Sequence, residues 1–436
     1  MEAVAPIARR PQSAHSWYVL GLLFVTYVMS MADRQLVGIL AEDIKRDLHL
    51  TDSQLGLVAG PAIAFFYAVL GVPMGFVADR MNRIRFLAGC LAVWSVMTIL
   101  GGRATNLVEL ALTRVGVSVA EAGGTPSSVS LLADFFRPNR RASAMAIWTA
   151  GSAAGIFVGF AFGGAINEAI GWRATFILAG VPGVLLAAIL LLTVPEPVRG
   201  AADDALVSSR PKLTLSMLQI FAFLWKIRLY RQGVLAAAGC NFCVFAVLTW
   251  APPFVHRSYG IGSAQAGAVL GTIIAGAGGT MMIVSGLIAD RLARRGLDRP
   301  LMAVSASIGG SAIFFALAFN APSFTAFAIF FTCAYSLLMT NPPITWVLVQ
   351  GSSPPEMRAM ATAIYLLVVN ICSSVPAPLL IGFLSDKLEP GYGTSGLRIA
   401  LWLVPLAAAI AAVQYARVAR SVRRGGADGT LGSNAI

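Results

Sequence analysis

The sequence predicts an all-α membrane protein with about twelve transmembrane helices in two pseudo-symmetric six-helix bundles. The first observation is composition, because 57% of the 436 residues are hydrophobic and only 12% are charged, whereas a soluble domain carries roughly 25% charged residues. The second is a series of apolar runs long enough to cross a bilayer. The third is a motif that recurs in both halves of the chain. These observations exclude a soluble enzyme.

The apolar runs approach or exceed the roughly 20 residues that a spanning helix needs. The first run follows Arg9 and Arg10, but no small-residue cleavage site comes after it, so we interpret it as an uncleaved helix and not as a signal peptide. We expect spanning helices near residues 17–40, 55–77, 84–102, 106–132, 141–168, 173–194, 231–256, 263–289, 300–319, 322–350, 358–385 and 397–418.

The runs divide the chain into five parts. A tail over residues 1–16 precedes a first six-helix bundle over 17–194, and a polar linker follows over 195–230. A second six-helix bundle is expected over 231–420, followed by a basic tail over 421–436. Each spanning helix must satisfy its own backbone hydrogen bonds in lipid, so the polar segments are expected outside the bilayer.

Lysine and arginine gather on one side of the predicted membrane. Most lie in the tails and in alternate loops, such as those around Arg85 and Arg141, and the remaining loops hold few. Because basic loops stay in the cytoplasm, we expect an inner-membrane protein with both termini cytoplasmic. An amphipathic helix is expected in the linker over residues 213–227. The net charge of +12 is therefore a topology signal and does not indicate a nucleic-acid partner.

One loop motif recurs in the two halves at a constant offset. The motif Gly-x-x-x-Asp-Arg begins at Gly75 after the second run and at Gly286 after the eighth, an offset of 286 − 75 = 211 residues. Glycine allows two helix ends to approach closely, and an Asp beside an Arg can hold a neighbouring helix until the halves rock apart. The predicted gating residues are Gly75, Asp79, Arg80, Arg83, Gly286, Asp290 and Arg291.

Charged residues inside apolar runs are the main candidates for transport chemistry. Each costs at least ~2.5–3.5 kcal/mol at the bilayer centre, so each requires a function or a partner. Those well inside the runs all belong to the N-terminal half, and they are Asp33, Arg34, Arg114 and Glu121. We expect them to bind protons and a substrate headgroup.

Helix geometry predicts which of these charges meet. At 1.5 Å per residue, Asp33 and Arg114 both lie about 10 Å below the outer end of their helices. Glu121 lies two turns beyond Arg114 on the same face, with Ser118 between them. We expect a column of ionisable groups, and the alternative is a structural ion pair that locks the first spanning helix to the fourth.

Three asparagines and several cysteines also lie in apolar runs. Asn241, Asn341 and Asn370 are candidate cavity-lining residues, and interhelical hydrogen bonding is the alternative interpretation. Cys240 and Cys243 form a CxxC pair without a second ligand pair, so we expect neither a metal nor a cofactor. No phosphate-binding GxxxxGK loop is present, which excludes ATP as the energy source.

Several stretches resemble the Spinster-like branch of the major facilitator superfamily. They are residues 32–45, 78–83, 114–124, 132–136 and 139–142. The resemblance implies the major facilitator fold and a secondary transporter, with Asp33, Arg114 and Glu121 at the family's proton and substrate positions. Animal members of this branch look like carriers of lysophospholipids and sphingoid lipids.

The functional expectation is a proton-linked transporter that moves an amphiphilic small molecule by alternating access as a monomer in the lipid bilayer. The polar anchors are confined to one half while the facing half is apolar, as a ligand with a headgroup and a tail requires. The alternatives on the same fold are a symporter of organic anions or sugar acids and a drug exporter. A non-transporting sensor is a different class, and the paired gate motifs argue against it.

Overall fold

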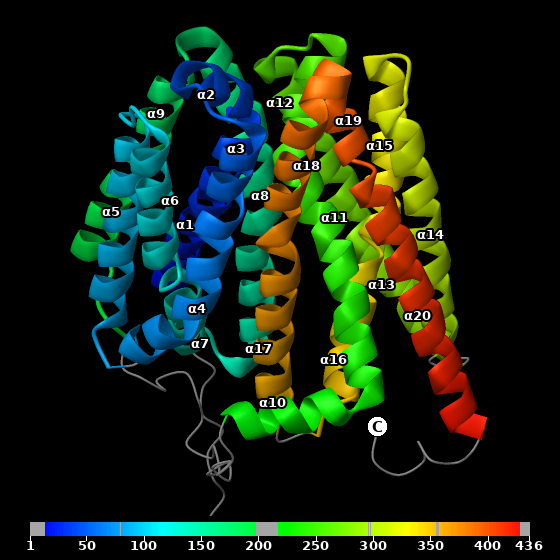
Figure 1. Ribbon diagram of the computed structural model, residues 1–436. Helices are drawn as coiled ribbons and strands as arrows, with labels where there is room; N and C mark the ends of the chain where they lie inside the picture. Colours follow the sequence, from blue (N-terminus) through cyan, green and yellow to red (C-terminus); the bar gives the residue numbers. More distant parts are fainter. Residues whose placement is uncertain are drawn as a thin grey trace, which may run out of the picture.

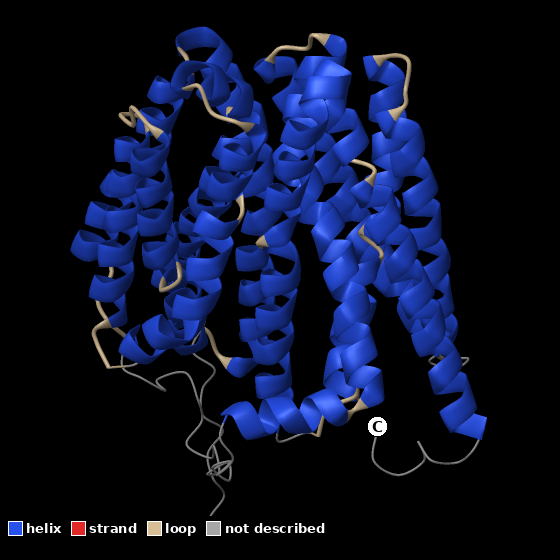
Figure 2. Ribbon diagram, in the orientation of Figure 1, coloured by secondary structure: helices blue, strands red, loops and turns tan. Residues whose placement is uncertain are grey.

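The computed structural model describes residues 14–78, 80–197, 217–294, 296, 298–354 and 357–427, and these residues form helices joined by short loops, without a strand (Figure 2). The helices are α1 (Ala14–Ile39), α2 (Ala41–Leu48), α3 (Asp52–Ala59), α4 (Pro61–Ala78), α5 (Arg83–Gly101), α6 (Leu107–Glu121), α7 (Gly124–Phe135), α8 (Pro138–Ile170), α9 (Trp172–Thr193), α10 (Met217–Lys226), α11 (Arg228–Tyr259), α12 (Ser263–Gly271), the π-helix η1 (Thr272–Ala277), α13 (Gly278–Ala293), α14 (Asp298–Phe319), α15 (Phe324–Leu338), α16 (Asn341–Gly351), α17 (Arg358–Val369), the π-helix η3 (Asn370–Ser374), α18 (Pro376–Tyr392), the short η4 (Gly393–Ser395), α19 (Gly396–Ala400) and α20 (Leu403–Ala427).

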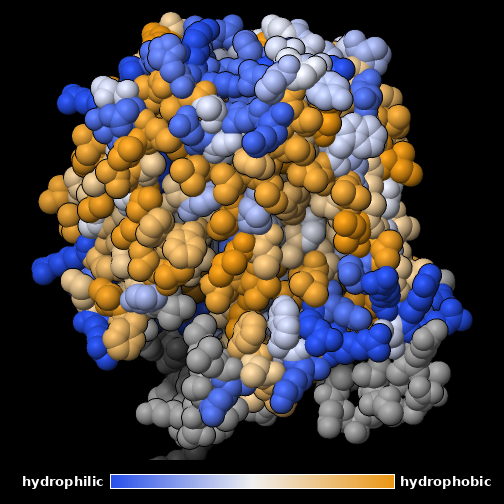
Figure 3. Space-filling view, viewed as in Figure 1, coloured by the Kyte–Doolittle hydropathy of each residue, from blue (hydrophilic) through white to orange (hydrophobic). Residues whose placement is uncertain are grey.

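Within the described residues, ten helical segments are long and apolar enough to cross a membrane. The expected run over 106–132 is not among them because it is broken into α6 and α7 at Ala122 and Gly123. The expected runs over 358–385 and 397–418 fall within one segment, Met360–Arg423. Many apolar side chains remain exposed, and they form a belt around the molecule between two hydrophilic ends (Figure 3).

Figure 1 shows the helices before α10 on one side of the molecule and those after it on the other. We call these the N-terminal half and the C-terminal half. The end at which α2 lies is called the α2 end, and the opposite end, which α10 crosses, is called the α10 end. Helix α10 occupies most of the amphipathic helix expected over 213–227, whose first residues lie outside the described chain.

The helix break repeats between the halves. The N-cap residues Asn106 of α6 and Ser323 of α15 differ by 217 residues, and so do the last helical residues, Glu121 and Leu338. At the first break a Cβ on Gly123 would lie 2.8 Å from the Phe86 ring, so the backbone passes too close to α5 for a side chain. Two prolines follow the second break in the first turn of α16, where their missing amides cost nothing.

A glycine seam on α8 fixes the position of α1. Cβ atoms on Gly155 and Gly159 would each lie 2.5 Å from a carbonyl oxygen of α1, those of Val28 and Ala32. Such small-residue spacing lets two helix backbones touch. The seam therefore presses α8 against the part of α1 that carries Asp33.

Candidate functional site

A buried ion pair joins α1 to α6 in the N-terminal half. Arg114 Nη1 donates to Asp33 Oδ2 at 3.0 Å, and the Thr98 hydroxyl of α5 donates to Asp33 Oδ1 at 2.8 Å. The Arg114 guanidinium lies 4.8 Å from the centre of the Phe176 ring on α9. Arg114 is fully buried and the Asp33 side chain is 7% exposed, so each charge depends on the other for compensation. This is the contact that equal depth predicted.

A second ion pair lies beside the first. Arg34 Nε donates to Glu121 Oε2 at 2.9 Å, and the Arg34 guanidinium stacks on the Tyr67 ring of α4 at 4.3 Å. The Tyr67 hydroxyl is 3.2 Å from Thr125 Oγ1 on α7. The Arg34 side chain is 24% exposed while that of Glu121 is 1% exposed. This pair is therefore the one within reach of water.

The expected column of Arg114, Ser118 and Glu121 is corrected in one respect. Side chains on a helix tilt toward its N-terminus, so Arg114 points away from Glu121 and toward the end of α5, where Gly101 leaves it space. Glu121 is satisfied from α1 by Arg34 instead. Ser118 is fully buried on the same face of α6.

The matching positions of the C-terminal half carry no charge. The offset of 217 residues relates Arg114 to Phe331 and Glu121 to Leu338 on α15, since 331 − 114 and 338 − 121 are equal. Both counterparts are buried hydrophobic residues. The polar anchors are thus one-sided, as expected from the sequence.

The three asparagines bond within or near their own helices. The amides of Asn241 and Asn370 donate to carbonyls one turn earlier, at 3.0 Å and 2.8 Å. Asn341 Oδ1 accepts bonds from Thr345, at 2.6 Å, and from the Tyr415 hydroxyl of α20. Only Asn341 therefore makes an interhelical side-chain bond of the kind that the alternative interpretation described.

The predicted gate residues lie at the α10 end, and the two motif glycines have matching surroundings. A Cβ on Gly75 would lie 3.7 Å from Pro126, and one on Gly286 would lie 3.8 Å from Pro343. The prolines are again 217 residues apart. Each glycine thus lies against the first turn of the helix that follows a break.

The arginines and aspartates of the gate motif differ in their contacts. Arg83 is buried, and it binds Glu196 at 2.8 Å, the Ser130 hydroxyl at 2.9 Å, and Asp134. All four residues belong to the N-terminal half, so Arg83 holds α5 to α7 and to the segment after α9.

The rest of the motif is more exposed. Arg80 stacks on the Phe76 ring at 3.7 Å. Asp290 and Arg291 are exposed and make no ion pair with another described residue. Asp79 lies outside the described residues.

The contacts that hold the halves together lie at the α2 end. Arg257, in the last turn of α11, donates to both carboxylate oxygens of Asp52 at 2.6 and 2.7 Å and to Glu42 at 2.7 Å. Asp52 also accepts from Lys45 and Ser385, each at 2.7 Å. We call this set the clasp.

A second anchor caps α3 from the other half. Asp386 of α18 accepts the backbone amides of Asp52 and Ser53 at 2.8 and 2.7 Å. Carboxylate oxygens favour the amide-rich start of a helix. Sequence reasoning missed the clasp and this cap because their residues sit at the ends of apolar runs, where a charge costs little.

Glycines bring the two backbones together beside the clasp. A Cβ on Gly267 would lie 2.0 Å from the Phe160 carbonyl oxygen, and one on Gly164 would lie 2.1 Å from that of Ser263. On the other flank a Cβ on Gly382 would lie 2.3 Å from the Asp52 carbonyl oxygen. Helices α8 and α12, and helices α3 and α18, therefore touch at the α2 end.

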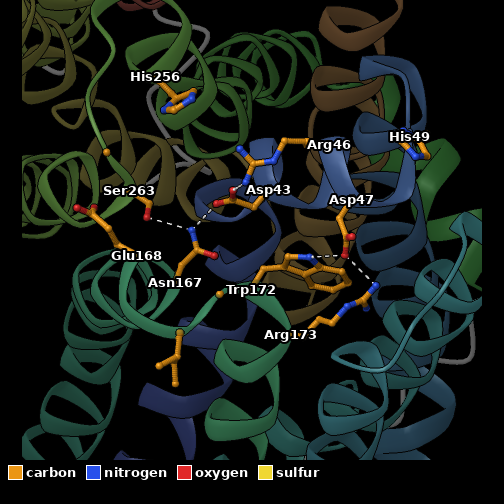
Figure 4. Close-up of a pocket in the computed structure, with 13 residues that line it drawn as sticks. Asp43, Arg46, Asp47, His49, Asn167, Glu168, Trp172, Arg173, His256 and Ser263 are labelled. Atoms are coloured by element: carbon orange, nitrogen blue, oxygen red, sulfur yellow. Dashed lines mark hydrogen bonds and ion pairs between the residues drawn. The ribbon is translucent and has the colours of Figure 1, made fainter.

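A polar pocket of about 780 Å³ opens at this end, between the two halves (Figure 4). Asn167 of α8 bridges Asp43, at 2.6 Å, and Ser263 of the other half, at 3.0 Å. Trp172 Nε1 and Arg173 both bind Asp47. In the described part of the chain no cluster of His, Cys, Asp and Glu could hold a metal.

Comparison with known proteins adds a family context. The family model of the Major Facilitator Superfamily matches residues 23–377. An MFS-type efflux pump of Mycolicibacterium smegmatis is 30% identical over 96% of each chain. A sphingosine-1-phosphate transporter of Danio rerio is 28% identical over 86% of this chain and 77% of that one. A D-galactonate transporter of Escherichia coli is 25% identical over 97% of this chain and 99% of that one.

A solved structure matches nearly the whole chain. It is the crystal structure of a bacterial homologue of the human lysosomal transporter Spinster in an inward-facing, unoccupied conformation. The TM-score is 0.86 at 25% identity, covering 94% of this chain and 98% of that one.

Proposed function

The chain belongs to the major facilitator superfamily, as a Spinster-like member, and we propose from this premise that it is a proton-linked secondary transporter of an amphiphilic solute. Family membership makes it a membrane transporter and not an enzyme. The proposed architecture is twelve transmembrane helices in two six-helix bundles, since the break between α6 and α7 and the merged segment Met360–Arg423 account for the difference between ten and twelve. Both termini are assigned to the cytoplasm of an inner-membrane protein.

Alternating access follows from where the halves touch. The clasp and the glycine contacts close the α2 end, which the basic loops assign to the outside. The gate motifs at the α10 end make no described ion pair across the halves. We therefore assign the structure to an inward-facing state, in agreement with the conformation of its solved relative.

The pair of Arg34 and Glu121 is the observation that carries the proton-linked function. Arg34 is partly exposed while its carboxylate partner is shielded from water. Protonation of Glu121 removes the charge that holds Arg34, which frees the guanidinium to bind an anionic headgroup. Loss of the proton reverses this exchange. Asp33 and Arg114, being buried, are assigned to hold α1 and α6 in register.

The amphiphile is favoured by the one-sided distribution of charge. A headgroup bound near Arg34 would face Phe331 and Leu338, the uncharged counterparts of the anchors, across the space between halves. The sphingosine-1-phosphate transporter among the relatives fits this class.

Two other substrate classes are supported by particular observations. A guanidinium that pairs with a carboxylate is suited to the carboxylate of a sugar acid, and the D-galactonate transporter is a relative. A lipophilic drug is supported by the efflux pump that aligns along 96% of the chain.

The test is flux driven by a pH gradient in proteoliposomes. A fluorescent lysophospholipid, D-galactonate and the lipophilic cation ethidium serve as alternative substrates. We expect Glu121→Gln to abolish response to the gradient while substrate binding persists, and Arg34→Gln to lose binding of the anionic substrate. Glu109→Gln is the matched control, because Glu109 is exposed at the start of the same helix.

Each outcome decides a separate part of the proposal. Gradient-driven flux that persists in Glu121→Gln would refute coupling through this pair. Flux of galactonate or ethidium without flux of the lysophospholipid would refute the amphiphile and select the corresponding alternative.

A further inference from the structure

A basic cavity lies where α11 begins and α20 ends. It has a volume of about 460 Å³, and its lining residues are Arg228, Arg417, Arg420 and Ser421. Arg417 and Arg420 are three residues apart, so they share one face of α20, and Arg228 is the first residue of α11. The two helices pack against each other, which places the three guanidinium groups around one cavity at the α10 end (Figure 1).

These three arginines have no anion to balance them. Across the described residues, none of the three forms an ion pair or a side-chain hydrogen bond with another residue, and all three are exposed. Arginine remains charged throughout the physiological pH range, so the groups repel one another. A phosphate group, with several oxygens for planar guanidinium donors, is the ligand that such a cluster fits best.

The same face of α20 leads from the cavity into the apolar belt. Leu406, Ile410 and Val413 are about half exposed, and Arg417 and Arg420 continue their spacing of three and four residues, which keeps all five on one stripe. An apolar groove of about 280 Å³ includes Leu406 and Ile410 together with Phe242 of α11. Ile410 and Arg417 are seven residues, or about 10 Å, apart along the helix.

Helix α10 indicates the depth of the cavity in the membrane. It lies across the ends of the spans and continues into α11 (Figure 1). Ile220 and Leu224 are buried, while Phe223 is 44% exposed. An amphipathic helix of this kind lies at the level of the lipid headgroups. In Figure 3 the hydrophilic surface at this end borders the apolar belt directly.

We propose that the seam between α11 and α20 binds an anionic phospholipid, with its phosphate in the arginine cavity and an acyl chain in the apolar groove. This lipid site lies within the C-terminal half, away from Arg34 and Glu121, and does not depend on the identity of the transported solute. The cavity supplies the charge recognition and the groove supplies the apolar contact, so both parts of the lipid are needed.

The test is lipid retention and thermal unfolding of the purified full chain in detergent. Phosphatidylglycerol is the anionic probe, phosphatidylcholine is the zwitterionic probe, and glycerol phosphate is the headgroup without acyl chains. Native mass spectrometry counts the bound lipid. We expect preferential retention of phosphatidylglycerol and no effect of glycerol phosphate.

The Arg417→Gln, Arg420→Gln double variant should bind phosphatidylglycerol about thirtyfold more weakly, which corresponds to about 2 kcal/mol at about 1 kcal/mol per arginine. The Arg294→Gln, Arg299→Gln double variant is the matched control, since both residues are exposed at the same end but outside the cavity. Arg228→Gln replaces the first double variant if that one does not fold.

Three results would overturn the proposal. The first is equal retention of the two lipids. The second is equal loss of phosphatidylglycerol in both double variants. The third is stabilisation by glycerol phosphate as strong as that by the lipid, which would identify a site for a free anion. A chain ending at Ala427 should keep the preference, and a lost preference would instead assign the cavity to the acidic C-terminal tail.

Discussion

An added methyl group at Gly267 should open the α2 end. A Cβ at this position on α12 would lie 2.0 Å from the Phe160 carbonyl oxygen and 2.9 Å from its carbon. Real Cβ contacts almost never fall below 3.0 Å, so the two helices must separate by about 3.0 − 2.0 = 1.0 Å. The obstacle is backbone and cannot rotate away.

The magnitude follows from the cost of overpacking, about 1–3 kcal/mol. The penalty applies to the closed α2 end and is relieved where the halves part, so Gly267→Ala should shift the equilibrium toward the outward-open state by about 5- to 150-fold. Gly279→Ala is the matched control, because a Cβ there meets nothing within 4 Å in the same apolar segment.

The assay is electron–electron distance measurement between spin labels on Arg46→Cys and Asn320→Cys, in a background without native cysteines. Both sites are exposed at the α2 end, one in each half. We expect a longer-distance population in Gly267→Ala that Gly279→Ala lacks. Identical distance distributions in the two variants, with both folded, would refute the assignment of these glycines to closure.

Further predictions concern the buried pair, the topology and the gate. Asp33→Asn should lower stability by about 3–5 kcal/mol because it leaves Arg114 buried without a counter-charge, and thermal unfolding in detergent would contradict this if the midpoint were unchanged. Reporter fusions at Arg141 should report the cytoplasm and those at Asp47 the outside, and a reversed pair would reject the orientation. Asp290→Asn should slow transport without loss of substrate binding, which wild-type flux would disprove.

Sequence reasoning located the buried pair because a charge in an apolar run is costly and therefore rare. Asp33 and Arg114 could be matched by counting the rise per residue along two helices. The partner of Glu121 could not be found in this way, since it depends on the rotation of α1 about its axis. Arg34 and Asp33 are adjacent in sequence yet serve different partners on α6.

The clasp left no comparable signal. Asp52, Arg257 and Asp386 lie where apolar runs end, and charged residues are ordinary there. Their importance depends on contacts across more than 200 residues of sequence. The glycines at the α2 end pose the same difficulty, because the sequence does not show which of 43 glycines face another backbone.

The repeated break between α6 and α7 and between α15 and α16 was partly readable. Gly123 and the prolines after Asn341 disfavour an uninterrupted helix, but the apolar runs around them continue, and hydropathy alone joins the two pieces. Both breaks follow at the same offset, which the charged anchors do not share. The backbone of the repeat is thus more symmetric than its side chains.

The glycine contacts at the α2 end also govern how abruptly this end can open. Where Gly267 meets Phe160 and Gly164 meets Ser263, backbone touches backbone and no flexible side chain can follow a retreating helix. A gap of 0.5–1 Å forfeits about a quarter to a half of the dispersion attraction. The resistance to opening is therefore concentrated in the first ångström of travel. We expect the outer side to release in a single abrupt step, with a rate set by that short displacement and not by the width of the final passage.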